Sequence, residues 1–252
     1  MAFSSLQRGF AHRLAMGVVD SAVAAFLAGR PVCLFDSEFR EGETDLLFAA
    51  GKVQPEDIRQ LRKDCGGLLF LAIGHEVGER FSLPFLQDLH TDSGLVENYP
   101  ILAKLVTDDL QYDSQSAFTL SLNHRQTFTG ITDADRGLTT RRFAELYQEL
   151  VAAEADAATS RSALGAEFRT PGHIPVCRES PGGLSTREGH TELAVGLARL
   201  AGVPPVVIGA EMLQPEGDAA LSVEAARRWA NERDIPFLCG DDLKLVLAAA
   251  DK

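Results

Sequence analysis

Short apolar runs recur along the 252-residue chain, and several follow one another through connections too short to hold a helix. The apolar runs 31–35 and 45–50, for example, are separated only by the polar segment 36–44. Neighbouring parallel strands need a crossover of about a dozen residues or more, so these short connections favour a mixed sheet over a purely parallel one. The sequence therefore predicts an α+β fold, in which helices pack on a mixed parallel and antiparallel sheet.

The spacing of apolar residues predicts the individual elements. Helices are expected at 5–29, 55–63, about 140–153, 190–201 and 223–233. Strands are expected at 31–35, 45–50, 68–73, 117–122, 174–178 and 205–210, and a short strand and a helix close the chain. The Ala- and Ser-rich segment 154–166 has no clear period and is interpreted as a surface connection within one domain, 1–252. Functional residues are expected in the long polar loops 36–44, 123–137 and 179–189.

The composition restricts the classes of function. A formal net charge of -12 repels phosphate backbones, and no concentrated basic patch is visible, so no nucleic-acid partner is expected. The apolar runs stop well before the roughly 20 residues that a bilayer-spanning helix needs, so no membrane partner is expected either. The four cysteines form no C-x-x-C pair, which is typical of reduced thiols, and the cytoplasm is the expected compartment.

An acidic segment, Asp36 to Asp45, lies directly between two apolar strands and holds five acids and one arginine within ten residues. One interpretation is a solvated acidic loop. The other is a metal or substrate site, because magnesium prefers carboxylate oxygens completed by water and substrate oxygens. Gly42 permits the unusual backbone angles that such a loop needs. The residue types alone leave both interpretations open.

Two further segments combine histidine with residues suited to binding. In 169–173 (R-T-P-G-H), a turn-forming Pro-Gly pair presents His173 just ahead of a strand, where a histidine is either structural or functional. In 186–192 (T-R-E-G-H-T-E), arginine, glycine, histidine and threonine meet at an expected helix start. This second segment is either an ordinary capped helix or a phosphate cradle from which His190 could reach a metal.

Glu211 stands at the end of the apolar strand 205–210. A glutamate at a strand end is commonly exposed, but a buried one can have a raised pKa and act as a base. Together with the three polar segments, Glu211 suggests acid–base chemistry on a phosphorylated, metal-chelating small molecule.

Five motifs occur in order: D-S-E-x-R-E-G-E-T-D-L from Asp36, T-G-I-T-x-x-D-R from Thr129, F-R-T-P-G-H from Phe168, T-R-x-G-H-T-E from Thr186 and G-A-E-M-L from Gly209. They resemble the motifs of the 3,4-dihydroxy-2-butanone 4-phosphate synthases in their stand-alone, archaeal form. The similarity covers nearly the whole chain, so it is far more specific than one motif. It implies that family's three-layer-like sandwich, and conversion of D-ribulose 5-phosphate to L-3,4-dihydroxy-2-butanone 4-phosphate and formate in riboflavin biosynthesis.

The resemblance also implies roles for individual residues. Glu41 would bind both of two magnesium ions and His190 one of them, with manganese as an alternative metal. His173 and Glu211 would be essential for turnover and serve proton transfer, while Glu43 would support the acidic loop. The expected substrate contacts are Arg40, Glu41, Asp45, Arg187, Glu188, Gly189, His190 and Thr191, and Thr129, Asp135 and Arg136 would lie near the site. The family implies a homodimer with its sites near the subunit interface.

The expected chemistry begins with removal of a proton from C3 of the sugar, and two metal ions would stabilise the charge that develops on the sugar oxygens. The group that takes this first proton is left open. Ser37 is a departure, because the family's loop often has a second consecutive acid there, which puts a minor metal or water contact in doubt. The cysteine cluster of the GTP cyclohydrolase II domain of bifunctional relatives is absent from the sequence, so that activity is not expected.

Three alternatives compete with the synthase interpretation. A sugar-phosphate isomerase that stops at the enediol would use the same base, metal and phosphate cradle. A nucleotide- or RNA-binding protein is the second, because the family's fold resembles that of the threonylcarbamoyl-adenylate synthases. The third is an inactive homologue kept as a binding partner. The intact matches at Glu41, His173, His190 and Glu211 argue against the last two.

Overall fold

A mixed sheet of six strands forms the centre of the protein, which a computed structural model describes over residues 5–107 and 109–250. The strand order is β6-β3-β7-β2-β1-β8. The strands are β1 (Val32–Phe35), β2 (Thr44–Ala49), β3 (Phe70–Ile73), β6 (Val176–Arg178), β7 (Val206–Glu211) and β8 (Phe237–Cys239). The β1–β8 and β3–β6 pairs are parallel, and the β1–β2, β2–β7 and β3–β7 pairs are antiparallel. The predicted mixed sheet is confirmed.

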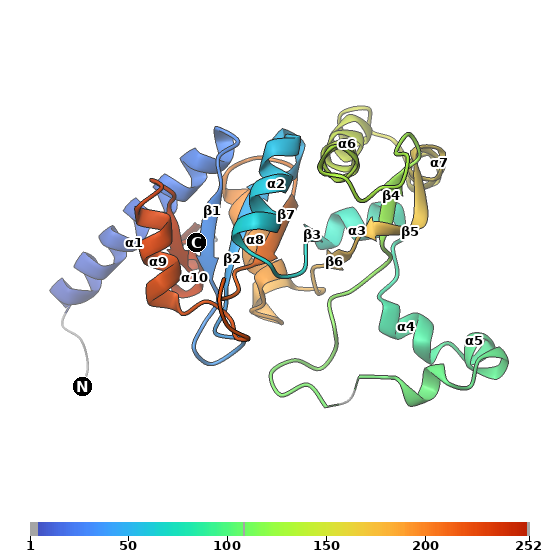
Figure 1. Cartoon of the computed structure of the whole chain (residues 1–252), viewed down its shortest axis with the longest axis horizontal. Coiled ribbons are helices and arrows are strands. Elements are labelled where there is room, and N and C mark those ends of the chain that lie inside the picture. The colour runs from blue at the N-terminus through green and yellow to red at the C-terminus, as the bar shows by residue number, and fades with distance from the viewer. Residues whose placement is uncertain (1–4, 108, 251–252) are drawn as a thin grey trace.

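Helices cover both faces of this sheet (Figure 1). One face packs against α1 (Ser5–Leu27), α8 (His190–Leu200) and α10 (Gly240–Ala250), and the other against α2 (Pro55–Asp64), α6 (Asp133–Ala152) and α9 (Val223–Asn231). The side chains alternate as strand geometry requires: Leu46 and Phe48 belong to one core cluster, Leu47 and Ala49 to the other. The fold is therefore a three-layer sandwich, as expected.

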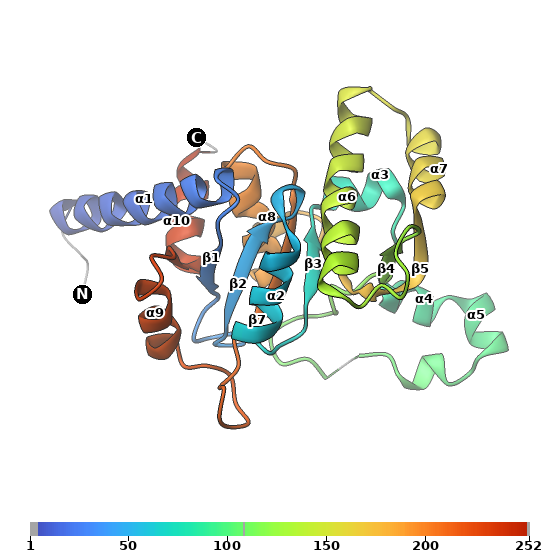
Figure 2. The same cartoon turned by 45° about the horizontal axis from the view of Figure 1, so that its top comes forward.

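A smaller antiparallel sheet lies beyond β3 and β6 (Figures 1 and 2). It consists of β4 (Leu122–His124) and β5 (Phe168–Ile174). Helices α6 and α7 (Ala157–Glu167) pack against it, and α3 (His75–Phe81) packs against α7. Short helices α4 (Leu86–Thr91) and α5 (Ser93–Asn98) project from the body as an arm (Figure 2). The 3-10 turns are η1 (Ala50–Lys52), η2 (Leu102–Lys104) and η3 (Gly183–Ser185). No helix in the described ranges combines the length and apolar character that crossing a bilayer requires.

Several expected elements differ in the structure. The segment 154–166 was interpreted as a connection, but most of it is α7, which starts where the side chain of Asp156 accepts a hydrogen bond from the Thr159 N–H at 2.7 Å. Helix α6 starts at Asp133, well before 140, because Thr132 caps it. The strand expected at 117–122 is wrong: β4 begins only at Leu122, and Phe118 forms a single bridge.

The segment 169–173 was expected to be a turn ahead of a strand, but it lies within β5. The pairing of β4 with β5 explains the difference, since Leu122 faces Ile174 whereas the next residue, Asn123, faces Arg169. Residues 170–173 are thus an insertion in the ladder, and the Pro-Gly pair sits in this irregularity.

Candidate active site

A cavity of about 360 Å³ opens where the β1–β2 loop, the start of α8 and the end of β7 come together. The segment that precedes β4 forms another part of its wall. The lining residues are Glu41, Glu43, Asp45, Leu68, Phe70, Leu110, Tyr112, Asp113, Gln115, Ser116, Ala117, Phe118, Cys177, Arg187, His190, Thr191 and Glu211. Acidic, basic and imidazole groups therefore share one small space.

The buried side chain of Asp36 holds the acidic loop in place through hydrogen bonds to its backbone. It is 2% exposed, and its two carboxylate oxygens accept hydrogen bonds from the backbone N–H groups of Glu41 and Glu43, each at 3.0 Å. Gly42, between these residues, has φ +67, a left-handed conformation that favours glycine. The sharp turn fixed by Asp36 and Gly42 places both glutamates on the cavity wall.

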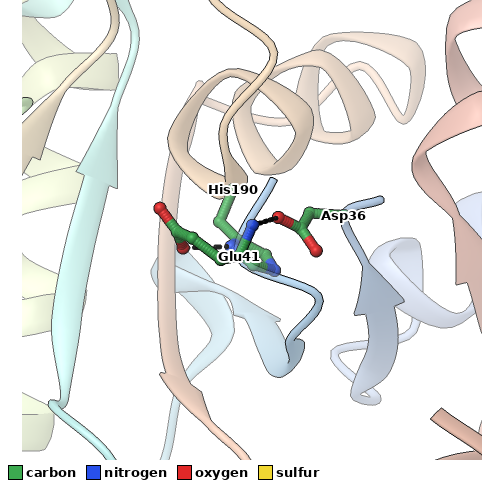
Figure 3. A group of neighbouring side chains, drawn as sticks. All are labelled: Asp36, Glu41 and His190. Carbon is green, nitrogen blue, oxygen red and sulfur yellow. Dashed lines mark hydrogen bonds and ion pairs between the residues drawn. The ribbon is translucent and has the colours of Figure 1, made fainter. Parts of the chain in front are cut away.

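His190 is the centre of a cluster of carboxylates, because α8 begins at this residue and carries its ring into the cavity. Its Nδ1 lies 3.3 Å from the Glu41 carboxylate, and its Nε2 lies 3.6 Å from the Asp45 carboxylate. Figure 3 shows Asp36, Glu41 and His190 side by side, and ligand atoms of all three lie within 4.8 Å of one another. Burial disfavours the charged ring, but the carboxylates of Asp45, Glu41 and Asp36 outweigh burial and raise the pKa of His190 to about 9.

Asp45 provides a direct test of whether a cation fits here. The residue is 0% exposed, and burial raises the pKa of its carboxyl to about 8. Among the described residues, neither of its carboxylate oxygens has a hydrogen-bond partner. Buried oxygens without partners are costly unless a proton or a cation serves them. Carboxylate oxygens with one imidazole nitrogen are a donor set that suits Mg²⁺ or Mn²⁺.

Glu211 lies opposite Asp45, because the ladder between β2 and β7 pairs these two residues. Burial raises the pKa of the Glu211 carboxyl. Its backbone carbonyl accepts a hydrogen bond from the Gly67 N–H at 3.0 Å, and its side chain lines the cavity. A carboxylate with a raised pKa at a cavity wall can act as a base.

Two arginines share one carboxylate at the other end of the site. Arg187 donates from Nε to Asp113 at 2.8 Å and from a terminal nitrogen to Glu192 at 2.6 Å. Arg40 donates to the same Asp113 carboxylate at 3.0 Å, and its guanidinium lies 5.1 Å from the ring centre of Tyr112. Sequence reasoning missed Asp113 and Tyr112, which lie on a segment without periodicity, and it also missed the role of Asp36 in shaping the loop.

The structure brings most of the expected site residues together. Glu41, Glu43, Asp45, Arg187, His190, Thr191 and Glu211 line the cavity, and Arg40 adjoins it through Asp113. Gly189 is the N-cap of α8. Glu188 is exposed and pairs with Lys244 of α10 at 2.7 Å, outside the cavity, so its contact with substrate stays a prediction.

His173 lies apart from this group. It is an exposed residue of β5, bonded to Asn123 of β4, and in the described chain it is not part of the cavity wall. Asp135 belongs to the same region. Its carboxylate accepts a hydrogen bond from the Gly130 N–H, and the carbonyl of the preceding residue, Thr129, accepts one from Asn123. Arg136 donates instead to Asp133, one turn earlier on α6. The expected site residues of one chain therefore lie in two places, the cavity and the region of the small sheet around His173.

Comparisons with known proteins identify the family. A family model described as 3,4-dihydroxy-2-butanone 4-phosphate synthase matches residues 20–245. A synthase of that name from Archaeoglobus fulgidus is 40% identical over 222 residues, which cover 88% of this chain and 90% of that protein. The synthase of Methanothermobacter thermautotrophicus is 36% identical over 226 residues, covering 90% of this chain and 94% of that protein.

Solved structures agree with these relatives. The synthase of Candida albicans superposes with a TM-score of 0.66 at 26% identity, covering 89% of this chain and 94% of the other. A synthase structure in complex with two magnesium ions gives the same TM-score at 25% identity, again covering 89% and 94%. Because both its sequence and its fold match, the chain belongs to the 3,4-dihydroxy-2-butanone 4-phosphate synthase family.

Proposed function

We propose that the protein converts D-ribulose 5-phosphate into L-3,4-dihydroxy-2-butanone 4-phosphate and formate, the lyase step that this family contributes to riboflavin biosynthesis. The observation that carries the proposal is the carboxylate and imidazole cluster of Glu41, Asp45 and His190 beside the arginine fork of Arg187. A cavity of about 360 Å³ has room for a five-carbon sugar phosphate.

The proposed phosphate site is the start of α8. The backbone N–H groups of a helix start favour an anion, and Arg187, Arg40 and the Thr191 hydroxyl add charge and hydrogen bonds. The phosphate would anchor one end of the sugar there, so that the carbon chain reaches the carboxylate cluster. Glu211, which is paired with Asp45 across the β2–β7 ladder and lines the same cavity, serves proton transfer in this arrangement.

The proposed cofactor is Mg²⁺, two ions per site, with Mn²⁺ as a substitute. Glu41, His190 and the unpartnered oxygens of Asp45 support it, as does the related structure that holds two magnesium ions. When bound, the metal supplies stabilisation of negative charge on the sugar oxygens.

Replacing Glu41 tests the metal site. Glu41→Ala should weaken binding of Mn²⁺, followed by paramagnetic resonance, about 100-fold and abolish metal-dependent turnover. Glu38→Ala is the matched control, because Glu38 is an exposed acid of the same loop outside the cavity. Metal binding that survives in Glu41→Ala would remove this assignment.

The proposal includes a homodimer, because His173 lies outside the cavity of its own chain. The loop whose Thr129 carbonyl contacts Asn123, the partner of His173, carries two exposed apolar side chains, Phe128 at 94% and Ile131 at 52% exposed. The arm and the segment that follows it add more exposed apolar side chains: Leu95 on α5, then Tyr99, Ile101 and Leu105. Exposed apolar patches of this kind are typical of interfaces. A second copy that covers them could present its His173 to the cavity of the first.

A single functional unit over the whole chain and a location in the cytoplasm are the remaining parts of the proposal. The four cysteines support the location, since they are free thiols and three of them are buried. Burial raises the pKa of Cys33 to about 12, so that thiol stays protonated and unreactive.

The test of the reaction uses ribulose 5-phosphate labelled with ¹³C at C4, incubated with the protein and either Mg²⁺ or EDTA. Label that appears in formate only with Mg²⁺ is the expected result in carbon NMR. Label that stays in a five-carbon sugar phosphate would replace the synthase with an isomerase, which uses the same base and metal but does not expel C4.

A further inference from the structure

We infer that Asn123 is a positioning residue, which holds the neutral imidazole of His173 with its proton on Nε2. The inference rests on the proposed function, in which His173 serves proton transfer. In this state Nε2–H donates a hydrogen bond to the substrate, and the Nδ1 lone pair is occupied by Asn123, so the first proton must go to another group.

The two residues meet at the irregular part of the small sheet. Asn123 is 3% exposed on β4, whereas His173 is exposed and belongs to the insertion at residues 170–173 of β5. Such insertions re-aim side chains and are common beside functional sites. A Cβ on Gly172 would lie 1.9 Å from the Leu122 carbonyl carbon, so the backbone of the insertion packs closely against the backbone of β4.

The orientation of the Asn123 amide is fixed by two backbone groups that cannot exchange roles. Its Oδ1 accepts a hydrogen bond from the backbone N–H of His173 at 2.8 Å, and an N–H can only donate. Its Nδ2 lies 3.3 Å from the Thr129 carbonyl oxygen, which can only accept. In a flipped amide, the NH₂ group would face the His173 N–H and the oxygen would face the Thr129 carbonyl, and neither pair can form a hydrogen bond. The assignment of the two ends is therefore unambiguous.

The same Nδ2 lies 3.1 Å from Nδ1 of His173. An amide nitrogen has hydrogens and accepts nothing, so Nδ1 must offer its lone pair. In a neutral ring the single proton is then on Nε2. To take up a further proton, the ring would have to protonate Nδ1 and break its bond with Asn123. Of the proposed acid–base residues, Glu211 is therefore the group left to remove the first proton.

The T-G-I-T-x-x-D-R motif acquires a role in this arrangement. Gly130 has φ +98, and a Cβ there would lie 2.2 Å from Nδ2 of Asn123. Its N–H donates to Asp135 at 2.9 Å, which ties the loop to the start of α6. Asp135 and Gly130 thereby hold the Thr129 carbonyl against the amide, and the amide in turn sets the ring of His173.

The first test reads the tautomer in the intact protein. Protein labelled with ¹⁵N-histidine is examined at alkaline pH by two-dimensional ¹H–¹⁵N correlation, and His173 is assigned by loss of its signals in His173→Gln. We expect a protonated Nε2 and a bare Nδ1. A protonated Nδ1 with a bare Nε2 in the wild-type protein would overturn the inference without need of any further variant.

Asn123→Asp tests the consequence. A carboxylate only accepts, so the tautomer should reverse, kcat for formate release should fall about 100-fold, and KM should stay within about twofold. Asn98→Asp is the matched control, since Asn98 is an exposed residue of α5 whose side chain donates to the Gly94 carbonyl of its own helix. A reversed tautomer with unchanged kcat would overturn the role.

A second variant covers the case in which Asn123→Asp does not fold. Asn123→Ala removes both bonds to His173, so we expect a mixture of tautomers and a loss in kcat of about tenfold, and the single wild-type tautomer in this variant would contradict the inference. The two levels of proposal fail separately. If the protein releases formate but His173 is protonated on Nδ1, only the inference about Asn123 is contradicted. If His173 has the expected tautomer but no formate is released, only the proposed function is contradicted.

Discussion

Asp113 accepts a hydrogen bond from Arg187 at 2.8 Å and so occupies the guanidinium that the proposed function assigns to the substrate phosphate. Its side chain is only 7% exposed, and Arg40 donates to the same carboxylate. A carboxylate and a phosphate use the same donors of an arginine, so Asp113 and the substrate compete for both cations.

Asp113→Asn should therefore strengthen the binding of ribulose 5-phosphate, by about fivefold, because it keeps the shape of the side chain and removes its charge. Titration calorimetry in EDTA measures the affinity without turnover. Asp109→Asn, at an exposed position of the same segment, should leave the affinity unchanged. Weaker binding in Asp113→Asn would mean that Asp113 prepares the arginines for the phosphate.

The raised pKa values in the cavity predict how the stability of the metal-free protein depends on pH. The folded pKa of His190 is about 9, above its ordinary value of 6.5, so the folded state holds this proton more tightly than the unfolded chain. This stabilisation is full below pH 6.5 and is lost as pH rises through 9. Asp45 acts in the same direction, since its pKa is raised from 3.8 to about 8.

Thermal unfolding in EDTA should accordingly show a falling midpoint between about pH 6.5 and 9, with a weaker slope in His190→Gln. Saturating Mg²⁺ should restore stability at the alkaline end, because a cation then serves the carboxylates in place of the proton. A midpoint that rises across this range in EDTA would contradict the assigned pKa directions.

Gly67 packs against the proposed base. A Cβ at this position would lie 2.4 Å from the Glu211 carboxylate and 2.6 Å from its backbone oxygen, so the strand end must shift. Gly67→Ala should lower kcat at least tenfold and destabilise the fold by about 1–3 kcal/mol. Gly165→Ala is the control, because a Cβ on Gly165 would meet no other described part of the chain within 4 Å, beyond its own neighbours and helix backbone, and alanine favours helices. Steady-state kinetics and thermal unfolding check both, and wild-type kcat in Gly67→Ala would contradict the placement of Glu211.

The sequence predicted the central layers well because burial leaves a strong local signal. The runs 68–73 and 205–210 are apolar throughout and became β3 and β7, and the positive φ of Gly29 marks the expected end of the first helix. The acidic loop and the start of α8 were also located, because their residue types are unusual between apolar segments. Their meeting point in space followed from the family resemblance.

The remainder could not be predicted for physical reasons. Helices α4 and α5 have no buried residue, so no apolar period marks them. Asp113 reaches Arg40 and Arg187 across more than seventy positions, a contact for which a single sequence gives no sign. The separation of His173 from Glu211 depends on β5 belonging to the small sheet, and the Pro-Gly pair concealed that strand.

The proposed sharing of a site between two chains leads to a quantitative expectation. His173→Ala and Glu211→Ala should each be inactive alone. If each site takes Glu211 from one chain and His173 from the other, a mixed dimer of the two variants has one intact site and one site with both changes. Random reassortment makes half of the dimers mixed, so the mixture should regain about a quarter of wild-type activity.

The decisive measurement is formate release from C4-labelled ribulose 5-phosphate by the two variants, unfolded and refolded together in equal amounts. Recovery of about a quarter of wild-type turnover, absent when the refolded variants are mixed only afterwards, is the predicted result. No recovery from co-refolded protein that is dimeric and metal-loaded would contradict a site built from Glu211 of one chain and His173 of its partner.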